Sequence, residues 1–408
     1  MAVRVLNKRR KISRKSVQQL PAEILVQIAS KLPVTSILQC FQRNKDGFNN
    51  IISDPLFPLL FHNDYTSSQN TSIFAYDACT NTSTLIDYDH YNHHLTEFRI
   101  NDFDYVYRLE KNTSRTILSN CNVVGNSCNG WLLVCLLLNY QNSVSASLRL
   151  VNPITRSCVL LPEAPYALAW QDPKYGFGYA SKTGLLKVVK LYHQPHTAKI
   201  TTQVLTVCDE DNNNSTWEVM DTECSVELSS IQSEAVALNG ALHWLVADNN
   251  LILRFDLDEE KFKFIPSPYT IKTCDENSNK TVSYLGVLNG LLCVGTACGS
   301  TIDKGMEIWV MKDYGIDKSW TCFTLIDYFD INTERFLLIP DLKNGKVLIL
   351  FNTLLSHHGD VREFYLDVYD PKQTKRDQRV PLLEGMDAES RARMRLHHFV
   401  PSLSFLSL

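Results

Sequence analysis

The sequence predicts an α+β chain in which helices and strands occupy separate segments. A small three-helix module is expected over residues 20–62, followed by a large all-β domain over residues 70–408. Apolar residues recur at helical spacing near the N-terminus, and farther on they recur in short runs between Asn, Gly, Asp and Ser turns. Residues 1–19 precede both parts and are expected to form a basic, disordered tail.

The helical module begins at Leu20-Pro21, because proline suits the first position of a helix. Pro33 ends this first helix, since the residue before a proline is pushed out of the helical region. Shorter apolar sets around Ile37 and Phe48 predict two more helices. Three such helices bury little surface by themselves, so the module is expected to pack against a partner. An ordinary helical cap on the larger domain is the alternative. The apolar face of the first helix consists of Ile24, Leu25, Ile28, Ala29 and Leu32.

The composition is that of a globular protein, with 44% hydrophobic and 21% charged residues among 408. The net charge of −4 gives no bias towards nucleic acid or anionic membrane, so neither is an expected partner. The longest apolar run, at 131–138, is far shorter than the ~20 residues of a membrane helix. No apolar signal region begins the chain, and the 12 cysteines include no CxxC pair. Reduced thiols, no structural metal and a cytoplasmic or nuclear location are therefore expected.

The basic tail contains a dense run of positive charge with no acidic residue. This run is a candidate nuclear import signal, and a solvated tail without a partner is the alternative. The run consists of Lys8, Arg9, Arg10, Lys11, Arg14 and Lys15.

Two elements repeat in the β-rich part. Asn-Gly pairs at 129–130, 239–240 and 289–290 each precede a buried run, which is typical of tight hairpin turns. A strand, a polar turn and a strand ending in proline recur at 151–162, 255–266 and 369–381, with 76–85 as a degenerate copy. Repeated hairpins at such spacing predict a β-propeller of six or seven blades. A pair of irregular β-sandwiches is the alternative, and an amphipathic helix is expected only at 388–396.

Several motifs in the helical module match a known pattern in order. The matching residues are Leu20-Pro21, Leu32-Pro33-Val34, Ile52-Ser53-Asp54-Pro55 and Phe57. With these residues the module resembles an F-box, although Phe48 stands where that family has tryptophan and the spacing to it is one residue long.

The β-rich part contains the motif Tyr175-Gly176-Phe177-Gly178-Tyr179, followed by residues 186–191. This pair resembles the "GFGYD…YKVV" segment of the F-box-associated domains of plants, with Ala180 in place of the aspartate. Residues 152–156, 238–244, 308–311 and 399–403 resemble further segments of the same family in the same order.

These resemblances imply the substrate-recognition subunit of an SCF-type, cullin-RING ubiquitin ligase. The F-box would bind a Skp-type adaptor, and through it the cullin, while the β domain would hold an unknown target protein. No residue is expected to be catalytic and no cofactor is expected. The implied adaptor contacts are Leu20, Pro21, Ile24, Leu25, Ile28, Leu32, Pro33, Ile37, Leu38 and Phe48. A scaffold outside any ligase, and a β-propeller enzyme or sugar-binding protein, are the alternatives.

Motifs that carry chemistry are missing from the sequence. Gly176-x-Gly178 lacks the third glycine of a dinucleotide site, and there is no phosphate loop or GxSxG elbow. The histidines at 90, 93 and 94 are expected to lie in a polar loop rather than to bind a metal. His243 is expected to be a hydrogen-bonded strand residue and not a general base.

Overall fold

The computed structural model describes residues 71–399 apart from 78–81, 90–93, 101–115, 126, 141–142, 156, 165–172, 194–199, 208–214, 225, 247–250, 269–280, 299–304, 327–332, 342–345, 356–360 and 374. Nearer the N-terminus it describes residues 24, 27, 28, 32, 36, 37 and 39. The three-helix module predicted for residues 20–62 therefore lies mainly outside the described residues. The basic tail predicted for residues 1–19 lies outside them entirely.

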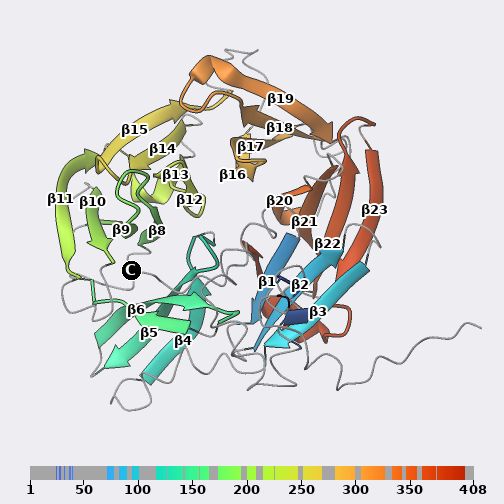
Figure 1. Ribbon diagram of the computed structural model, residues 1–408, viewed down its shortest axis with the longest axis horizontal. Coiled ribbons are helices and arrows are strands. Elements are labelled where there is room, and N and C mark those ends of the chain that lie inside the picture. The colour runs from blue at the N-terminus through green and yellow to red at the C-terminus, as the bar shows by residue number, and fades with distance from the viewer. Residues whose placement is uncertain are drawn as a thin grey trace, which may run out of the picture.

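The described strands form six four-stranded sheets that stand side by side in a ring (Figure 1). Each sheet is a blade whose strands pair antiparallel from the centre of the ring to its rim. This is the architecture of a β-propeller. The predicted mostly-β chain with a propeller-type domain is confirmed, and the described blades number six rather than seven.

The strands of blades 1 to 3 are given from centre to rim. Blade 1 contains β24 (Met394–Phe399), β1 (Thr71–Asp77), β2 (Thr82–Asp89) and β3 (His94–Ile100). Blade 2 contains β4 (Thr116–Val123), β5 (Leu132–Tyr140), β6 (Ser143–Asn152) and β7 (Ser157–Leu160). Blade 3 contains β8 (Lys174–Tyr179), β9 (Leu186–His193), β10 (Ile200–Thr206) and β11 (Trp217–Cys224).

Blades 4 to 6 follow the same order. Blade 4 contains β12 (Val236–Leu238), β13 (Ala241–Val246), β14 (Leu251–Asp256) and β15 (Lys261–Pro266). Blade 5 contains β16 (Thr281–Leu288), β17 (Leu291–Cys298), β18 (Gly305–Met311) and β19 (Trp320–Ile326). Blade 6 contains β20 (Thr333–Asp341), β21 (Lys346–Leu355), β22 (Val361–Asp370) and β23 (Lys375–Leu382). The short helices are η4 (Leu228–Ser230), η6 (Asp317–Ser319) and α7 (Ala388–Arg393).

The two faces of the ring connect strands differently. Hairpins between the first and second strands of a blade, and between the third and fourth, lie on one face, which we call the turn face. The opposite face, which we call the connection face, carries the remaining hairpins and the links from one blade to the next. The longest links in the domain, such as 101–115 and 161–173, belong to the connection face.

Blade 1 combines strands from both ends of the domain. Strand β24 pairs antiparallel with β1, with Ser72 opposite Phe399 and Asp77 opposite Met394. Beside this pairing, Arg393 Nε lies 3.3 Å from Asp77 Oδ2. The helix expected at 388–396 ends at Arg393, and the chain then continues as the closing strand. The entry into β1 and the exit from β24 consequently both lie on the turn face.

The Asn-Gly pairs form the predicted tight turns between the two innermost strands of blades 2, 4 and 5. Asn129, Asn239 and Asn289 have φ of 47°, 50° and 54°, and the glycine after each also has positive φ. Two successive positive φ values define a type I′ turn, whose twist matches that of the flanking strands.

The second repeat caps the outer hairpins of alternate blades. Asn152 Oδ1 accepts hydrogen bonds from the amides of Ile154 and Thr155, and Asp256 Oδ1 accepts from those of Asp258 and Glu259. Asp370 Oδ1 accepts likewise from the Lys372 amide. These Asx turns belong to blades 2, 4 and 6, so the repeat recurs every second blade. The prediction of a further copy at 76–85 was wrong. The other copies join the third and fourth strands of a blade, whereas residues 78–81 join the second and third strands of blade 1.

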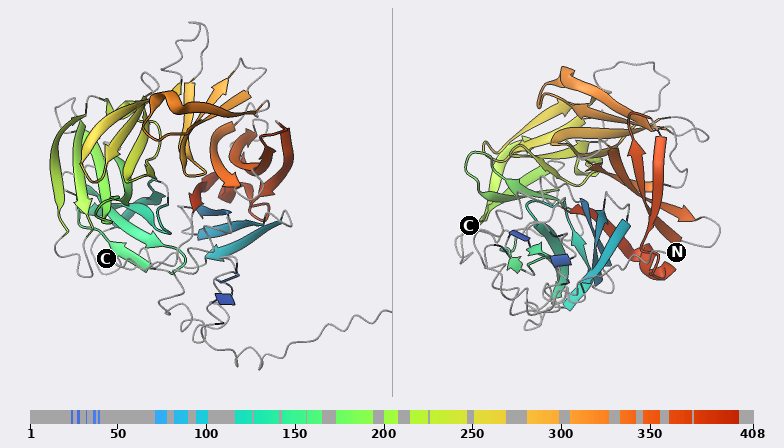
Figure 2. Two further views of the ribbon diagram at one scale, coloured as in Figure 1. Left: turned by 45° about the horizontal axis from the view of Figure 1, so that its top comes forward. Right: turned by 45° about the vertical axis from the view of Figure 1, so that its right-hand side comes forward.

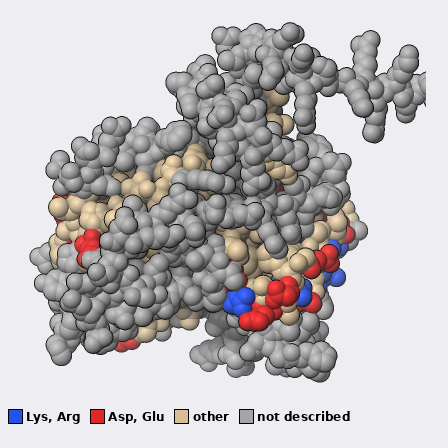
Figure 3. Space-filling model, turned by 90° about the horizontal axis from the view of Figure 1, so that it is seen from below, with Lys and Arg blue, Asp and Glu red and all other residues tan. Residues whose placement is uncertain are grey.

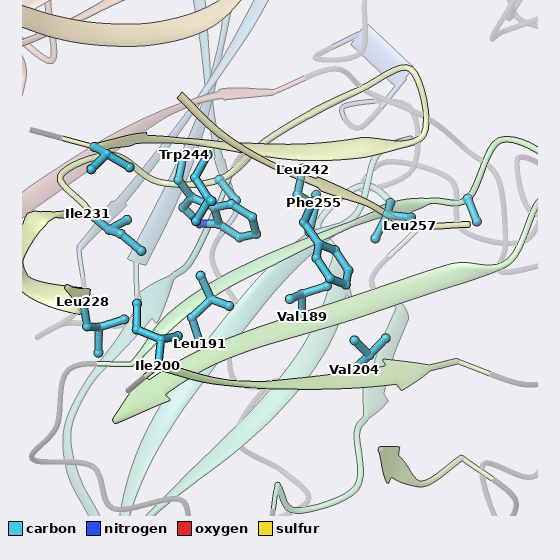
Figure 4. Close-up of a cluster of buried hydrophobic side chains, with 14 residues drawn as sticks. Val189, Leu191, Ile200, Val204, Leu228, Ile231, Leu242, Trp244, Phe255 and Leu257 are labelled. Atoms are coloured by element: carbon cyan, nitrogen blue, oxygen red, sulfur yellow. The ribbon is translucent and has the colours of Figure 1, made fainter. Parts of the chain in front are cut away.

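The hydrophobic core is divided between the blades. Each of the five buried clusters among the described residues draws its side chains from two neighbouring blades. Figure 4 shows the cluster between blades 3 and 4, where Val189 and Leu191 face Leu242, Trp244 and Phe255. Burial between sheets stabilises the fold in proportion to the apolar area removed from water, so every blade depends on its neighbours.

The two glycines of the motif at 175–179 set how closely blade 3 approaches blade 4. A Cβ on Gly176 would lie 2.5 Å from the Ala235 Cβ, and 3.0 Å from side-chain atoms of Leu242 and Trp244. A Cβ on Gly178 would lie 3.2 Å from the Ala237 Cβ. Strand β8 therefore needs glycine on its blade-4 side, while Phe177 packs on the opposite side against blade 2.

Indole side chains join neighbouring blades at the rim. Trp217 Nε1 donates to the Pro162 carbonyl at 2.9 Å, and Trp320 Nε1 donates to the Pro266 carbonyl at 2.9 Å. In each case the tryptophan is the first residue of an outermost strand. The proline ends or closely follows the outermost strand of the preceding blade. The strand-ending prolines of the second repeat thus supply an acceptor to the next blade.

We predict that Gly176→Ala lowers the free energy of unfolding by about 2 kcal/mol, because overpacking a close contact typically costs ~1–3 kcal/mol. Gly385→Ala is the matched control, since its Cβ would have no neighbour within 4 Å. Urea unfolding of both variants and the parent protein measures the difference. Equal midpoints for Gly176→Ala and the parent would contradict the close-packing role.

Candidate functional site

Two isoleucines of the predicted adaptor site lie exposed on helical backbone. Ile24 and Ile28, together with Gln27, are helical. Their side chains are 42% and 48% exposed, among the most exposed large apolar residues in the described part of the chain. Residues four apart lie on the same side of a helix, so the two isoleucines form an apolar strip open to solvent. Figure 2 shows the described helical pieces of this segment in blue, outside the ring of blades.

The other predicted adaptor residues have different settings. Ile37 lies on helical backbone and is fully buried, and Leu32 is half-buried at a bend. Ile37 is therefore not exposed to solvent in the described structure. Outside the described residues lie Leu20, Pro21, Leu25, Pro33, Leu38 and Phe48 of the adaptor set, and Lys8, Arg9, Arg10, Lys11, Arg14 and Lys15 of the candidate import signal.

The helical segment joins the propeller on its turn face. It precedes β1, whose first residue Thr71 lies at that face next to the end of β24. The connection face is on the far side of the ring from this entry point. One face therefore adjoins the helical segment, and the other carries the longest loops.

A polar network links blades 4 and 5 beneath the turn face. His243 is fully buried, with Nδ1 3.0 Å from the Val236 carbonyl and Nε2 2.8 Å from the Tyr314 hydroxyl. A carbonyl only accepts, so Nδ1 carries the proton and Nε2 accepts from the tyrosine. Arg254 Nε donates to the same hydroxyl at 3.0 Å, and Arg254 Nη2 donates to Asp256 Oδ2 at 2.6 Å.

The imidazole in this network is neutral. Burial lowers the pKa of His243 to about 4, against the opposing effect of the hydrogen bond to Val236. Its only lone pair is occupied by Tyr314 and no water can reach it, so it cannot act as a general base. The prediction that His243 is a hydrogen-bonded strand residue is confirmed.

A second set of contacts links blades 3 and 4 on the turn face. Asp258 Oδ2 accepts from the Ser181 hydroxyl at 2.8 Å and from the Lys182 amide at 3.0 Å. Close by, Lys187 Nζ lies 2.7 Å from Glu260 Oε1. The first contact joins the turn after β8 to the outer turn of blade 4, and the second joins the start of β9 to the same outer turn. Both contacts are therefore inter-blade ties.

The described residues contain neither a metal cluster nor a membrane-length helix. No group of three or more His, Cys, Asp or Glu side chains among them is placed to hold a metal ion. None of the helices they form is long and apolar enough to cross a membrane. On the side of the molecule shown in Figure 3, the described acidic and basic side chains lie intermixed rather than in a basic stripe.

Comparison with known proteins identifies the domain. The model of the F-box associated beta propeller domain matches residues 98–402. The chain belongs to this family. The motif at 175–179 and the Asn-Gly turns described above lie within the matched range, so the resemblance seen in the sequence is confirmed.

Relatives of this F-box-associated chain are F-box proteins of Arabidopsis thaliana. F-box protein At3g07870 is 30% identical over 287 residues, covering 62% of this chain but only 64% of that protein. F-box/kelch-repeat protein At3g23880 is 27% identical over 315 residues, covering 75% and 79% of the two chains. F-box protein At1g30790 is 24% identical over 402 residues, covering 92% of both. The chain is thus a plant-type F-box protein with an F-box-associated domain.

Sequence reasoning found some of these residues and missed others. Periodicity picked out Ile24 and Ile28, and flanking apolar residues indicated that His243 is structural. No sequence pattern pointed to Tyr314 as a partner of His243, because Tyr314 lies 71 residues away in a loop outside both repeats. The tie between Asp258 and Ser181 was also missed, since 77 residues separate the two side chains.

We predict that the neutral His243 makes the propeller sensitive to acid. With a folded-state pKa near 4 and an unfolded value near 6.5, the unfolded chain binds the proton more readily as pH falls. The free energy of unfolding should keep its full value above pH 6.5 and be lower by about 2 kcal/mol at pH 5. Urea unfolding at pH 7 and pH 5 measures the loss, and His243→Gln, which lacks this titration, is the control. An equal loss in both proteins would refute the assignment.

Proposed function

We propose that this F-box protein is the substrate-recognition subunit of an SCF-type ubiquitin ligase. Its F-box would bind a Skp-type adaptor, and through it the cullin, while its propeller would bind a target protein. The observation that carries the proposal is the solvent-exposed pair Ile24 and Ile28, in an F-box sequence joined to an F-box-associated domain. Exposed apolar strips of this kind favour contact with a partner.

The proposed mechanism is proximity rather than chemistry by this chain. Holding a target and a ubiquitin-charged enzyme in one assembly raises their effective concentration, which speeds transfer without a catalytic side chain. The inter-blade ties suit this role, because they hold the blades in fixed relation to one another. We accordingly propose a non-catalytic subunit with no cofactor.

The connection face is the proposed side for the target. The F-box segment joins the chain on the turn face, so an adaptor docked there would leave the opposite face open. Long loops tolerate change in sequence and commonly carry specificity on a rigid scaffold. We further propose a cytoplasmic or nuclear location, with the basic run at residues 8–15 as the import signal.

A scaffold outside any ligase is the second candidate. The observation that favours it is Phe48, which stands in place of the family tryptophan with one extra residue before it. This change would weaken adaptor binding if the indole contributes to the interface. Co-expression with a Skp-type adaptor followed by size-exclusion chromatography separates the two candidates. Co-elution as a complex supports the ligase subunit, and separate elution of two folded proteins supports the scaffold.

We predict that the double variant Ile24→Ala, Ile28→Ala weakens adaptor binding by at least about tenfold. Truncating a well-buried interface residue typically costs about 1–2 kcal/mol, and both side chains would be covered in the complex. Titration calorimetry with purified adaptor measures the affinity. The thermal unfolding midpoint of the propeller should not change.

Ile316→Ala is the matched control for this experiment. Ile316 is an isoleucine of similar exposure, 55%, on the propeller, and its truncation should leave adaptor affinity unchanged. Leu20→Ala with Pro21→Ala should reproduce the loss through the start of the same helix. Unchanged affinity in both double variants would sink the adaptor assignment.

A further inference from the structure

Three Asn-Gly turns on the turn face share one local geometry but have different surroundings. Asn129, Asn239 and Asn289 are all exposed, with φ of 47°, 50° and 54°. They join the two innermost strands of blades 2, 4 and 5. A fourth Asn-Gly pair, at 344–345, lies outside the described residues. Differences in chemistry among the three described turns must therefore come mainly from the contacts around each one.

An asparagine followed by glycine can lose its side-chain amide without an enzyme. The glycine backbone nitrogen gives up its proton and bonds to the asparagine Cγ, the Cγ–Nδ2 bond breaks, and ammonia leaves. Water then opens the five-membered imide at one of its two ring C–N bonds, which gives aspartate or isoaspartate. Glycine favours the first step because it has no Cβ to hinder the approach of its nitrogen. The reaction consumes only water and involves no change of oxidation state.

A closed type I′ turn hinders this ring closure. The turn holds ψ of its first central residue at roughly +30°, whereas the glycine nitrogen reaches Cγ only when that peptide unit rotates far out of the turn. The turn must therefore open locally before it reacts. Local opening is easier where fewer contacts hold a segment closed, so the contacts of each turn set its rate.

Contacts with other segments hold the turns of blades 2 and 4 closed. The Asn129 side chain shares a hydrogen bond with the Tyr179 hydroxyl of blade 3. In blade 4, the Gly240 carbonyl accepts from the Leu257 amide at 2.9 Å. A Cβ on Gly240 would lie 2.7 Å from the Ser181 Cβ, so blade 3 also packs closely against this turn. Opening either turn would break these contacts.

The turn of blade 5 lacks this support in the described structure. Asn289 and Gly290 are both exposed. A Cβ on Gly290 would meet no atom within 4 Å beyond its chain neighbours, so no other blade packs against the glycine. We propose that Asn289 is a site of spontaneous deamidation, which the fold selects over Asn129 and Asn239 by leaving its turn unsupported.

The two products affect the hairpin differently. Aspartate before glycine is also typical of type I′ turns, so this product keeps the turn and adds only a negative charge. Isoaspartate carries the chain through Cγ, which adds one carbon to the backbone of a two-residue turn and disturbs its match to the strand twist. Deamidation would therefore alter the inner hairpin of blade 5 on the face that the F-box segment joins.

Peptide mapping by mass spectrometry of the full-length chain, aged in mildly alkaline buffer, tests the proposal. In the folded protein Asn289 should lose its amide at least about fivefold faster than Asn129 or Asn239, the factor that one net hydrogen bond gives to local opening. In urea the three rates should converge, because each asparagine precedes glycine. Equal rates in the folded protein would overturn the proposal. An advantage of Asn289 that is just as large in urea would also overturn it, since sequence neighbours would then explain it.

Two variants test whether contacts control the rates. Tyr179→Phe removes the hydrogen bond to Asn129 and should raise the rate at Asn129 towards that at Asn289. The rate at Asn289 in the same sample should stay constant, which excludes a general loosening of the fold. Asn289→Gly is the matched control, since Gly-Gly also forms type I′ turns, and it should leave the other two rates unchanged. If Tyr179→Phe does not change the rate at Asn129, contacts do not protect these turns and the proposal fails.

Discussion

The pairing of β24 with β1 is the contact on which the propeller depends. It joins residues more than 300 positions apart, and the Arg393–Asp77 contact beside it spans 316. Without β24, blade 1 would lose its innermost strand and expose an unpaired edge at the centre of the ring. Because the core is divided among pairs of blades, one open junction would also uncover apolar faces on both sides. Closure is therefore a condition for the stability of every blade.

Neighbouring blades are held together by several kinds of contact. Near the centre, glycines at 176 and 178 let β8 approach the side chains of blade 4 closely. Beneath the turn face, hydrogen bonds through His243 and Tyr314 join blades 4 and 5. At the rim, indole groups bond to the prolines of the preceding blade. These ties act at different radii, so relative rotation of two blades would disrupt several of them together.

This construction suits a protein whose proposed work is to hold others in place. The F-box segment joins the ring on the turn face, where turns of blades 3 and 4 are tied to one another. The longest links lie on the opposite face, farthest from that junction. Specificity for a target can then change through those links while the inter-blade contacts stay the same.

Local features of this protein follow from short stretches of its sequence. Asn-Gly pairs, Asx turns and strand-ending prolines identified hairpins, because turn chemistry depends on the few residues that form the turn. Helical spacing identified Ile24 and Ile28 for a similar reason. The blade count was left at six or seven, since one repeat appears only in alternate blades and the other is missing from some.

Contacts between distant segments could be found only in the folded ring. The closing strand and the Tyr314 partner of His243 each bring together residues from separate strands or blades. A residue type at one position does not reveal its partner when dozens of residues intervene, and burial depends on which blades become neighbours. Those relations arise from closing the ring, which is a property of the whole chain.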